Sequence, residues 1–321
     1  MGKSLLSVRN LKMYFFTRKG AVKAVDSINL EVGDGEMIGL VGESGCGKTM
    51  TAFSILRLVP NPGKIINGEI IFEGKNLLDL TKKRMRSIRG KKISMIFQDP
   101  LTYLNPVLKV GDQIKENILL HTCVNKSEAK KRVIEILKKV GLPSPAKLSQ
   151  YYPHQLSGGM RQRVVIAMAI ACNPSLLIAD EPTTFLDVTI QAQILKLIRK
   201  LVKTLGVSLL MITHDLGVVA EVCDRVYVMY SGKIVESATV FSIYKNCKHP
   251  YTIGLLNSVL SINKYKKTLE AIEGSVPSLI NPPSGCRFHP RCKRKMAICS
   301  EKEPTFIEIE PGHIVSCWLY T

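Results

Sequence analysis

The segment Gly42–Thr49 constrains the fold of this chain more than any other, because it fits the phosphate-binding pattern G-x-x-x-x-G-K-S/T. The short apolar run Glu36–Val41 leads into it, and the helical pattern of Met50–Val59 follows it and stops at Pro60. A buried strand, a glycine-rich loop and a helix in this order form the context in which such a loop holds a nucleoside triphosphate. The sequence therefore predicts an α/β fold that binds a nucleotide.

Length and composition fit one large α/β domain with a smaller appendage. The chain has 321 residues, of which 45% are apolar and 22% charged, the profile of a folded protein. Its formal net charge of +19 favours anionic partners such as nucleotides, nucleic acids or membrane surfaces. The most basic run, residues 82–92, lacks the interleaved aromatic side chains that stack on single strands, so we interpret it as a solvated face.

The sequence offers no segment that would carry the chain into a membrane. No apolar run approaches the roughly 20 residues that span a bilayer, and the N-terminus lacks the apolar core of a signal peptide. We therefore expect a cytosolic protein that reaches a membrane only through a partner.

The residues of the glycine-rich loop have separate expected roles. Gly42, Gly45 and Gly47 allow the backbone to curl until its N–H groups face the phosphates. We expect Lys48 to reach the β- and γ-phosphates of ATP and the Thr49 hydroxyl to ligate Mg²⁺. The other loop residues counted among the ATP contacts are Glu43, Ser44 and Cys46. A thiol at a helix N-terminus can be redox-sensitive, but we interpret this one as a small tolerated side chain.

A second element for ATP chemistry is the apolar segment Ser175–Ala179, which ends in the carboxylate pair Asp180 and Glu181. A buried strand would deliver Asp180 to the magnesium shell and place Glu181 where it can polarise the attacking water as a general base. Two adjacent carboxylates at a strand end can also cap the next helix. The upstream phosphate loop favours the catalytic interpretation.

Five motifs occur in the order found in the ATP-binding cassette (ABC) ATPases, which the chain resembles over nearly all of residues 5–240. They are similar to the P-loop, the Q-loop, the signature, the Walker B pair and the switch histidine: Gly42–Thr49, Gln98, Leu156–Met160, Asp180–Glu181 and His214. The resemblance implies an α/β P-loop ABC ATPase with a RecA-like core, an antiparallel β subdomain and a helical subdomain. A small Cys-rich C-terminal extension would follow.

The resemblance also implies the roles of residues outside the P-loop. In the family two cassettes dimerise head to tail, so the signature residues Ser157, Gly158 and Gly159 would contact ATP bound to the other subunit. Gln98 would sense the γ-phosphate and Mg²⁺. His214 would contact the γ-phosphate and position Glu181.

The coupling loop and the adenine contact are less clearly defined by the resemblance. Asp187 resembles the loop that couples the two ATP sites, although Phe185 stands where the family usually has a small residue. Adenine usually stacks on an aromatic side chain near the N-terminus of the cassette. Phe15 is preferred for this contact over Tyr14 and Phe16, and a core position in a strand is the alternative.

The coarse organisation follows from periodicity and composition. Further strands are expected at Gly68–Phe72, Ile93–Phe97 and Val207–Thr213, and the clearest helix at Ser127–Val140. Residues 106–172 are mainly helical in pattern. We expect residues 1–250 to form the ABC nucleotide-binding domain, with its helical subdomain at about 106–172, and residues 251–321 to form the C-terminal extension.

Several strings resemble the dipeptide and oligopeptide importer branch of the ABC family, which also includes nickel importers. They are Val41–Gly45, Phe97–Pro106, Tyr152–Gln155, His249–Thr252 and Gly285–Cys292. The resemblance implies an ATPase that powers peptide uptake at the cytoplasmic face of the cell membrane. Its partners would be a second, homologous ABC ATPase, two transmembrane permeases and, indirectly, an extracytoplasmic peptide-binding protein.

The competing class is a soluble ABC ATPase that acts on nucleic acid or ribosomes. One type interrupts its cassette with a long coiled coil, and another carries two cassettes in one chain. This sequence has one uninterrupted cassette. We therefore expect no nucleic-acid partner.

Four of the nine cysteines crowd into the last part of the chain: Cys286, Cys292, Cys299 and Cys317. A cytosolic location disfavours disulfides, and structural zinc sites usually show tighter C-x₂₋₄-C spacing. A 4Fe–4S cluster also takes four thiolates. We favour this cluster, with Zn²⁺ and a metal-free segment as the alternatives.

Overall fold

The computed structural model describes residues 4–258 and 272–321. The chain divides into two compact units. The first unit comprises residues 1–33, 37–79 and 211–321, and the second comprises residues 34–36 and 80–210.

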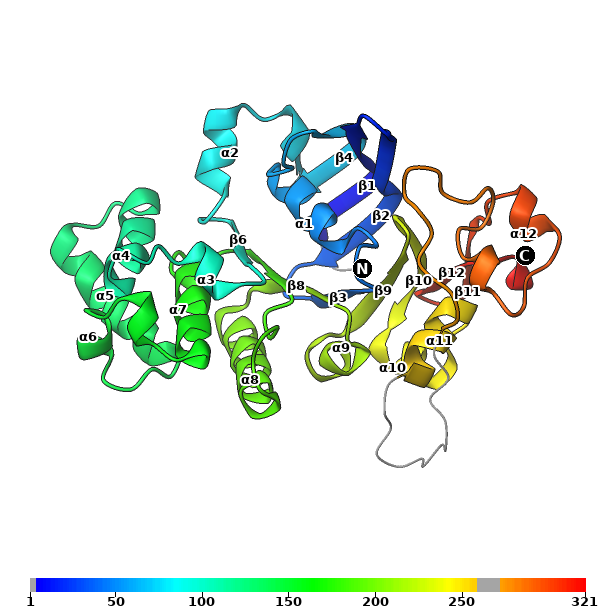
Figure 1. Cartoon of the computed structure of the whole chain (residues 1–321). Helices are drawn as coiled ribbons and strands as arrows, with labels where there is room; N and C mark the ends of the chain where they lie inside the picture. The colour runs from blue at the N-terminus through cyan, green and yellow to red at the C-terminus, as the bar shows by residue number, and fades with distance from the viewer. Residues whose placement is uncertain (1–3, 259–271) are drawn as a thin grey trace. The chain divides into compact units, whose positions relative to one another are not determined.

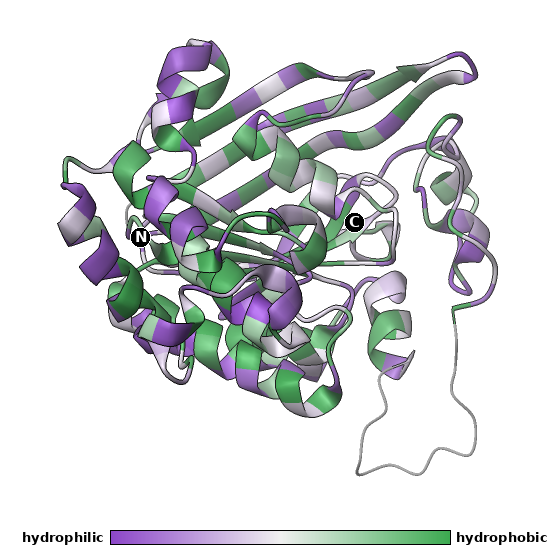
Figure 2. Cartoon of the chain, turned by 60° about the vertical axis from the view of Figure 1, so that its left-hand side comes forward, coloured by the Kyte–Doolittle hydropathy of each residue, from purple (hydrophilic) through white to green (hydrophobic). Residues whose placement is uncertain are grey.

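The first unit contains an antiparallel sheet with the strand order β2-β1-β4-β5. Its strands are β1 (Ser4–Thr17), β2 (Gly20–Gly33), β4 (Gly63–Phe72) and β5 (Lys75–Asn76). Leu6 on β1 pairs with Val32 on one side and Phe72 on the other, and all three side chains are buried. Hydrophobic and hydrophilic residues alternate along these strands (Figure 2), as expected for a sheet that packs one face against a core.

A second group of strands in the first unit has the order β11-β12-β10-β9-β3. They are β3 (Met37–Val41), β9 (Arg225–Tyr230), β10 (Lys233–Thr239), β11 (Phe306–Glu310) and β12 (His313–Ser316). β3 and β9 are parallel, and both are almost entirely buried and apolar. Glu236 on β10 pairs with Val315 on β12, so the C-terminal hairpin extends the group of strands that carries the phosphate loop (Figure 1).

Short helices complete the first unit. They are α1 (Lys48–Leu56), α9 (Leu216–Val222), α10 (Val240–Asn246), α11 (Pro250–Ser258) and α12 (Ile298–Glu301). α1 begins at the end of the phosphate loop and ends at Leu56, and the next residue, Arg57, caps it with a left-handed backbone (φ 52°).

The second unit combines two parallel strands with a group of helices. Strands β6 (Ile93–Ile96) and β7 (Leu176–Asp180) pair in register, with Ile96 opposite Ala179. The helices are α2 (Lys82–Ile88), α3 (Pro100–Tyr103), α4 (Val110–His121), α5 (Lys126–Lys139), α6 (Pro145–Leu148), α7 (Gly158–Ile170) and α8 (Val188–Leu205). α4, α5, α6 and α7 lie together (Figure 1), in the part of the chain whose pattern is mainly helical.

Helix α5 illustrates how the sequence specifies these elements. The Asn125 side chain caps its N-terminus by accepting a hydrogen bond from the Glu128 N–H, and two lysines lie in its last turn. Ala129, Val133 and Leu137 recur at helical spacing and are buried. This confirms the helix predicted at Ser127–Val140.

Strand β8 (Ser208–Thr213) is buried throughout and begins in the second unit and ends in the first. Within the described ranges, 4–258 and 272–321, no helix has both the length and the apolar character needed to cross a membrane.

Candidate nucleotide-binding site

The phosphate loop connects β3 to α1 in the first unit, and its backbone requires glycine at two positions. Gly47 adopts φ 111°, and a Cβ atom there would lie 2.1 Å from the carbonyl oxygen of Ala24. A Cβ atom at Gly42 would lie 2.1 Å from the carbonyl oxygen of Met229. Both distances are far below van der Waals contact, so the neighbouring strands pack directly against the loop backbone.

Lys48 begins α1, and its side chain turns back over the loop. The residue is 5% exposed, and its Nζ donates hydrogen bonds to the carbonyl oxygens of Gly42 (2.7 Å) and Glu43 (3.0 Å). No acidic residue lies in the first turn of α1. The ammonium group and the helix N-terminus together give this loop a positive potential, which suits an anion.

The other loop residues differ in exposure. Ser44 and Gly45 are exposed, whereas Cys46 is buried and Thr49 is half-buried. Burial raises the pKa of the Cys46 thiol, so the group stays protonated at neutral pH. This protonation fits its interpretation as a small packing side chain rather than a reactive thiol.

In the second unit the structure brings Gln98 and Glu181 together. β6 and β7 are parallel with Ile96 opposite Ala179, so the residues that follow them emerge at the same edge of the sheet. Gln98 Nε2 donates a hydrogen bond of 3.0 Å to Glu181 Oε2, and the Thr184 hydroxyl donates to the same oxygen at 3.0 Å. Asp180, the last residue of β7, is 3% exposed.

The signature residues form the N-terminus of α7, also in the second unit. Ser157 caps the helix by accepting a hydrogen bond from the Met160 N–H, and no acidic residue lies in the first turn. Ser157 and Gly158 are exposed, and Gly159 is half-buried. This end of the helix therefore presents N–H groups and a positive dipole to the surface.

Asp187 caps α8, because its carboxylate accepts a hydrogen bond of 2.9 Å from the Ile190 N–H. This cap was not predicted from the sequence. Phe185 precedes it with a left-handed backbone (φ 66°) and an 83% exposed side chain. The residue that departs from the family pattern thus lies on the surface.

The remaining ATP candidates lie in the first unit. His214 follows β8 and is exposed. Of the three aromatic residues considered for adenine, Tyr14 donates a hydrogen bond of 2.7 Å to the buried Asp26 carboxylate. Phe15 is half-buried on β1 and Phe16 is 48% exposed, so these two keep accessible ring surface.

The four C-terminal cysteines lie near one another, but they do not form a metal-ligand set. All nine cysteines of the chain lie among the described residues and are free thiols. Burial, with a smaller contribution from the neighbouring Cys299, Cys317 and Cys292, raises the pKa of Cys286 to about 11. Within the described part of the chain, no three or more His, Cys, Asp or Glu side chains are grouped to hold a metal ion. Among the described residues, the structure therefore groups no ligand set for the expected 4Fe–4S cluster or for Zn²⁺.

Two contacts to the phosphate loop were not anticipated from the sequence. The Glu43 N–H donates a hydrogen bond of 2.8 Å to Tyr251 Oη, and the Glu43 carboxylate forms an ion pair of 2.7 Å with Arg291. Both partners fall in strings already quoted as typical of the peptide-importer branch, His249–Thr252 and Gly285–Cys292. The resemblance marked those strings without indicating what they contact.

Comparison with known protein families gives two matches along the chain. The ABC transporter family matches residues 25–184. The family described as oligopeptide/dipeptide transporter, C-terminal region, matches residues 235–299.

Similar proteins match over nearly the whole length. The oligopeptide transport ATP-binding protein AppD of Bacillus subtilis is 50% identical, covering 99% of this chain and 97% of the relative. The dipeptide transport ATP-binding protein DppD of Bacillus subtilis is 49% identical, covering 99% and 95%. The oligopeptide transport ATP-binding protein OppD of Escherichia coli is 45% identical, covering 98% and 93%.

A solved structure of similar fold is the dimeric post-hydrolysis state of the ATP-binding cassette MJ0796 bound to ADP and Pi. It has a TM-score of 0.66 and 28% identity, and it covers 73% of this chain and 98% of that one. This likeness confirms the predicted ABC ATPase fold. With the full-length relatives, it shows that the chain belongs to the oligopeptide and dipeptide transport ATP-binding proteins of the ABC transporter family.

Proposed function

We propose that this chain is the ATP-hydrolysing subunit that powers uptake of dipeptides or oligopeptides through partner membrane permeases. One observation carries the proposal. Similarity does not end with the cassette but continues through residues 235–299, the region shared by oligopeptide and dipeptide transporters. A match to this region favours peptide transport over a soluble ABC ATPase that acts on nucleic acid or ribosomes.

In this function the first unit would hold the phosphates of ATP. The Lys48 ammonium and backbone N–H groups between Ser44 and Thr49 would contact them, and Phe15 would stack on the adenine. The Thr49 hydroxyl and the side-chain oxygens of Gln98 and Asp180 are the hard donors that Mg²⁺ prefers, so the residues fit this ion. Mg²⁺ would supply charge neutralisation at the phosphates.

Hydrolysis would depend on Glu181 as the general base. Its carboxylate would accept the proton of the attacking water while Gln98 fixes its orientation through the 3.0 Å hydrogen bond. His214 would donate to the γ-phosphate. The exposed signature end of α7, with Ser157, would contact ATP bound to a second, homologous ABC ATPase, and Asp187 would lie at the same interface.

Partner permeases would dock beside the Q-loop at the cytoplasmic face of the membrane. Leu101 (60% exposed), Tyr103 (43%) and Val107 (75%) follow Gln98 and present apolar surface to solvent. Two transmembrane permeases would receive the substrate from an extracytoplasmic peptide-binding protein.

The cysteine cluster stays a separate proposal, a 4Fe–4S cluster with Zn²⁺ as the alternative. It is supported by four cysteines in the C-terminal part of the chain that are close enough to affect one another's pKa. Purification without oxygen, followed by iron, sulfide and zinc analysis per chain, tests it. About four irons and four sulfides would support the cluster, and metal-free protein would end the proposal.

The transport proposal is tested in cells that lack this chain. Uptake of labelled di- and oligopeptides is expected to be lost, restored by the wild-type chain and not restored by Lys48→Ala. Exposed Lys64 supplies the control variant Lys64→Ala, which should restore uptake fully. Unchanged peptide uptake together with lost nickel uptake would instead favour the nickel-importer alternative.

A further inference from the structure

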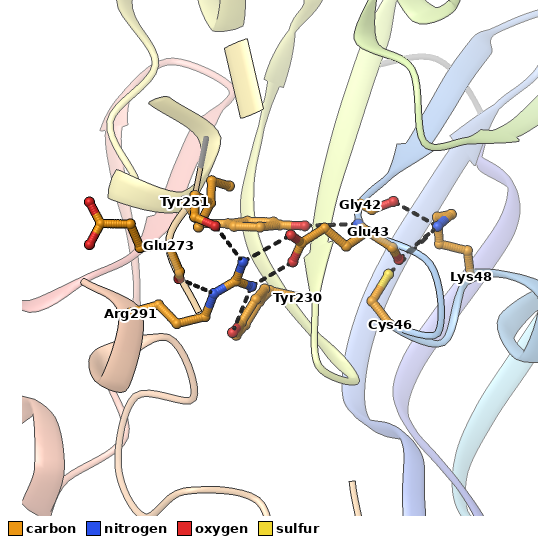
Figure 3. A network of polar contacts seen from close by, with 9 residues as sticks. Gly42, Glu43, Cys46, Lys48, Tyr230, Tyr251, Glu273 and Arg291 are labelled. Carbon is orange, nitrogen blue, oxygen red and sulfur yellow. Dashed lines mark hydrogen bonds and ion pairs between the residues drawn. The ribbon is translucent and has the colours of Figure 1, made fainter. Parts of the chain in front are cut away.

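Arg291, in the C-terminal extension, contacts the phosphate loop of the cassette directly. Its Nη1 lies 2.7 Å from Glu43 Oε2 and its Nη2 lies 3.1 Å from Glu43 Oε1, which makes a two-pronged ion pair (Figure 3). The two residues are 248 positions apart in the sequence. Both belong to the first unit.

All five N–H donors of Arg291 have an acceptor. Besides the two bonds to Glu43, Nη1 donates to Tyr230 Oη (3.4 Å), and Nη2 and Nε donate to the carbonyl oxygens of Ile272 (3.2 Å) and Glu273 (2.9 Å). The side chain is only 5% exposed, and the hydrogen bond to Glu43 raises its pKa further above the usual arginine value. Only arginine can make this set of contacts, because its planar guanidinium carries five N–H donors. The ammonium group of lysine has three donors and cannot pair with both carboxylate oxygens in one plane.

The pair reaches the phosphate-binding lysine through the backbone of Glu43. The Glu43 carbonyl oxygen accepts a hydrogen bond of 3.0 Å from Lys48 Nζ, and the Glu43 N–H donates to Tyr251 Oη at 2.8 Å. Glu43 is therefore held at its carboxylate, its N–H and its carbonyl group at once (Figure 3). Movement of its side chain would disturb the carbonyl that anchors Lys48.

Aromatic packing supports the same contact. The rings of Tyr230 and Tyr251 lie 4.6 Å apart, and the Phe288 ring packs edge-on against Tyr230 at 5.2 Å. Phe288 lies three residues before Arg291 and is 3% exposed. The neighbouring Arg287 forms a second anchor, an ion pair with the buried Asp26.

We propose that Arg291 is a positioning residue for ATP: by holding and neutralising Glu43, it fixes the phosphate loop and Lys48 in the conformation that binds the triphosphate. The inference rests on the proposed ATP-binding function. Without Arg291, the Glu43 carboxylate would remain as an uncompensated negative charge in the loop that receives an anion. Removal of one partner from such a pair leaves the other charge unpaired, which costs more than removal of both.

The test measures Mg-ATP affinity of the full chain by calorimetry. Arg291→Met is expected to weaken ATP binding about tenfold, and Arg291→Lys to recover little of it. The double variant Arg291→Met with Glu43→Gln should bind ATP better than Arg291→Met alone, because the unpaired carboxylate is gone. Lys295→Met is the matched control, since Lys295 is an exposed basic residue of the same segment.

The outcomes separate this inference from the function on which it rests. If the wild-type chain binds no ATP, the proposed function fails first. If the wild type binds ATP and Arg291→Met binds it equally well, Arg291 does not position the loop. If Arg291→Met and Arg291→Lys lose ATP affinity but the double variant recovers none, Arg291 only stabilises the fold. Lower urea unfolding midpoints of the same variants would corroborate that result.

Discussion

The side-chain amide of Gln98 lies 3.0 Å from the carboxylate of Glu181 and donates a hydrogen bond to it. The two residues are 83 positions apart in the sequence, yet each lies two positions beyond its member of the register pair Ile96 and Ala179. Glu181 also has a left-handed backbone (φ 44°), a conformation that costs a non-glycine residue about 1–3 kcal/mol. Strain of this kind often marks a site where a side chain must point in one direction.

Glu181→Gln should therefore abolish most ATP turnover while ATP binding is kept. The amide cannot accept a proton from water, and loss of a general base lowers the rate by about 10²–10⁴-fold. Steady-state ATPase activity of the chain assembled with its partner subunits, together with an ATP-binding measurement, checks this. Exposed Glu135 offers the control Glu135→Gln. Normal turnover in Glu181→Gln would exclude Glu181 as the base.

Much of the cassette could be predicted because its motifs are local. The glycine spacing of Gly42–Thr49 and the apolar run before Asp180 each reflect a constraint within a few residues. The periodic pattern of α5 is likewise self-contained, and the helix was predicted from it.

The contacts made by Arg291 and by the C-terminal hairpin could not be predicted, because they join residues far apart in the sequence. Nothing local to Arg291 indicates Glu43 as its partner. The strand Phe306–Glu310 has a half-exposed, alternating pattern, and its pairing with β12 depends on the distant β10. The number of cysteines suggested a metal, but sequence spacing does not determine whether their thiols converge.

Two glycines of the phosphate loop give a matched pair of stability predictions. Gly45 and Gly47 both have positive φ, 79° and 111°, but a Cβ atom at Gly45 would meet nothing within 4 Å. Gly45→Ala should cost about 1–2 kcal/mol from backbone strain alone. Gly47→Ala must also move the Ala24 carbonyl group and should cost at least about 3 kcal/mol. Urea unfolding of the nucleotide-free chain measures both, and equal losses would contradict the close packing described for Gly47.

Glu236 holds the C-terminal hairpin through a buried carboxylate. It is 0% exposed and accepts hydrogen bonds from the N–H groups of Lys248 (2.7 Å) and His249 (3.0 Å), and His313 Nε2 lies 2.8 Å from it. Glu236→Ala would leave buried donors unpaired, so we expect a loss of about 3 kcal/mol or more in unfolding free energy. Exposed Glu301 gives the control Glu301→Ala, with a change within about 0.5 kcal/mol. Similar values for the two variants would show that the carboxylate does not stabilise the hairpin.

His249 should make the stability of the protein fall between pH 7 and pH 5. Complete burial lowers the pKa of this imidazole to about 3, and its Nδ1 accepts the Tyr251 N–H at 3.1 Å, so the ring stays neutral in the folded chain. In the unfolded chain the pKa is about 6.5, so acidification protonates the unfolded state first and favours unfolding. This stability contribution is complete above pH 6.5 and is lost progressively toward pH 3.

The expected loss from His249 alone is about 2 kcal/mol between pH 7 and pH 5. Urea unfolding of His249→Gln at both pH values should show a pH dependence weaker by that amount than the wild type shows. If His249→Gln retained the full wild-type dependence, the folded chain would have to accommodate a protonated imidazole at this position, and the burial of His249 against Phe288 and Tyr251 would not exclude the charge.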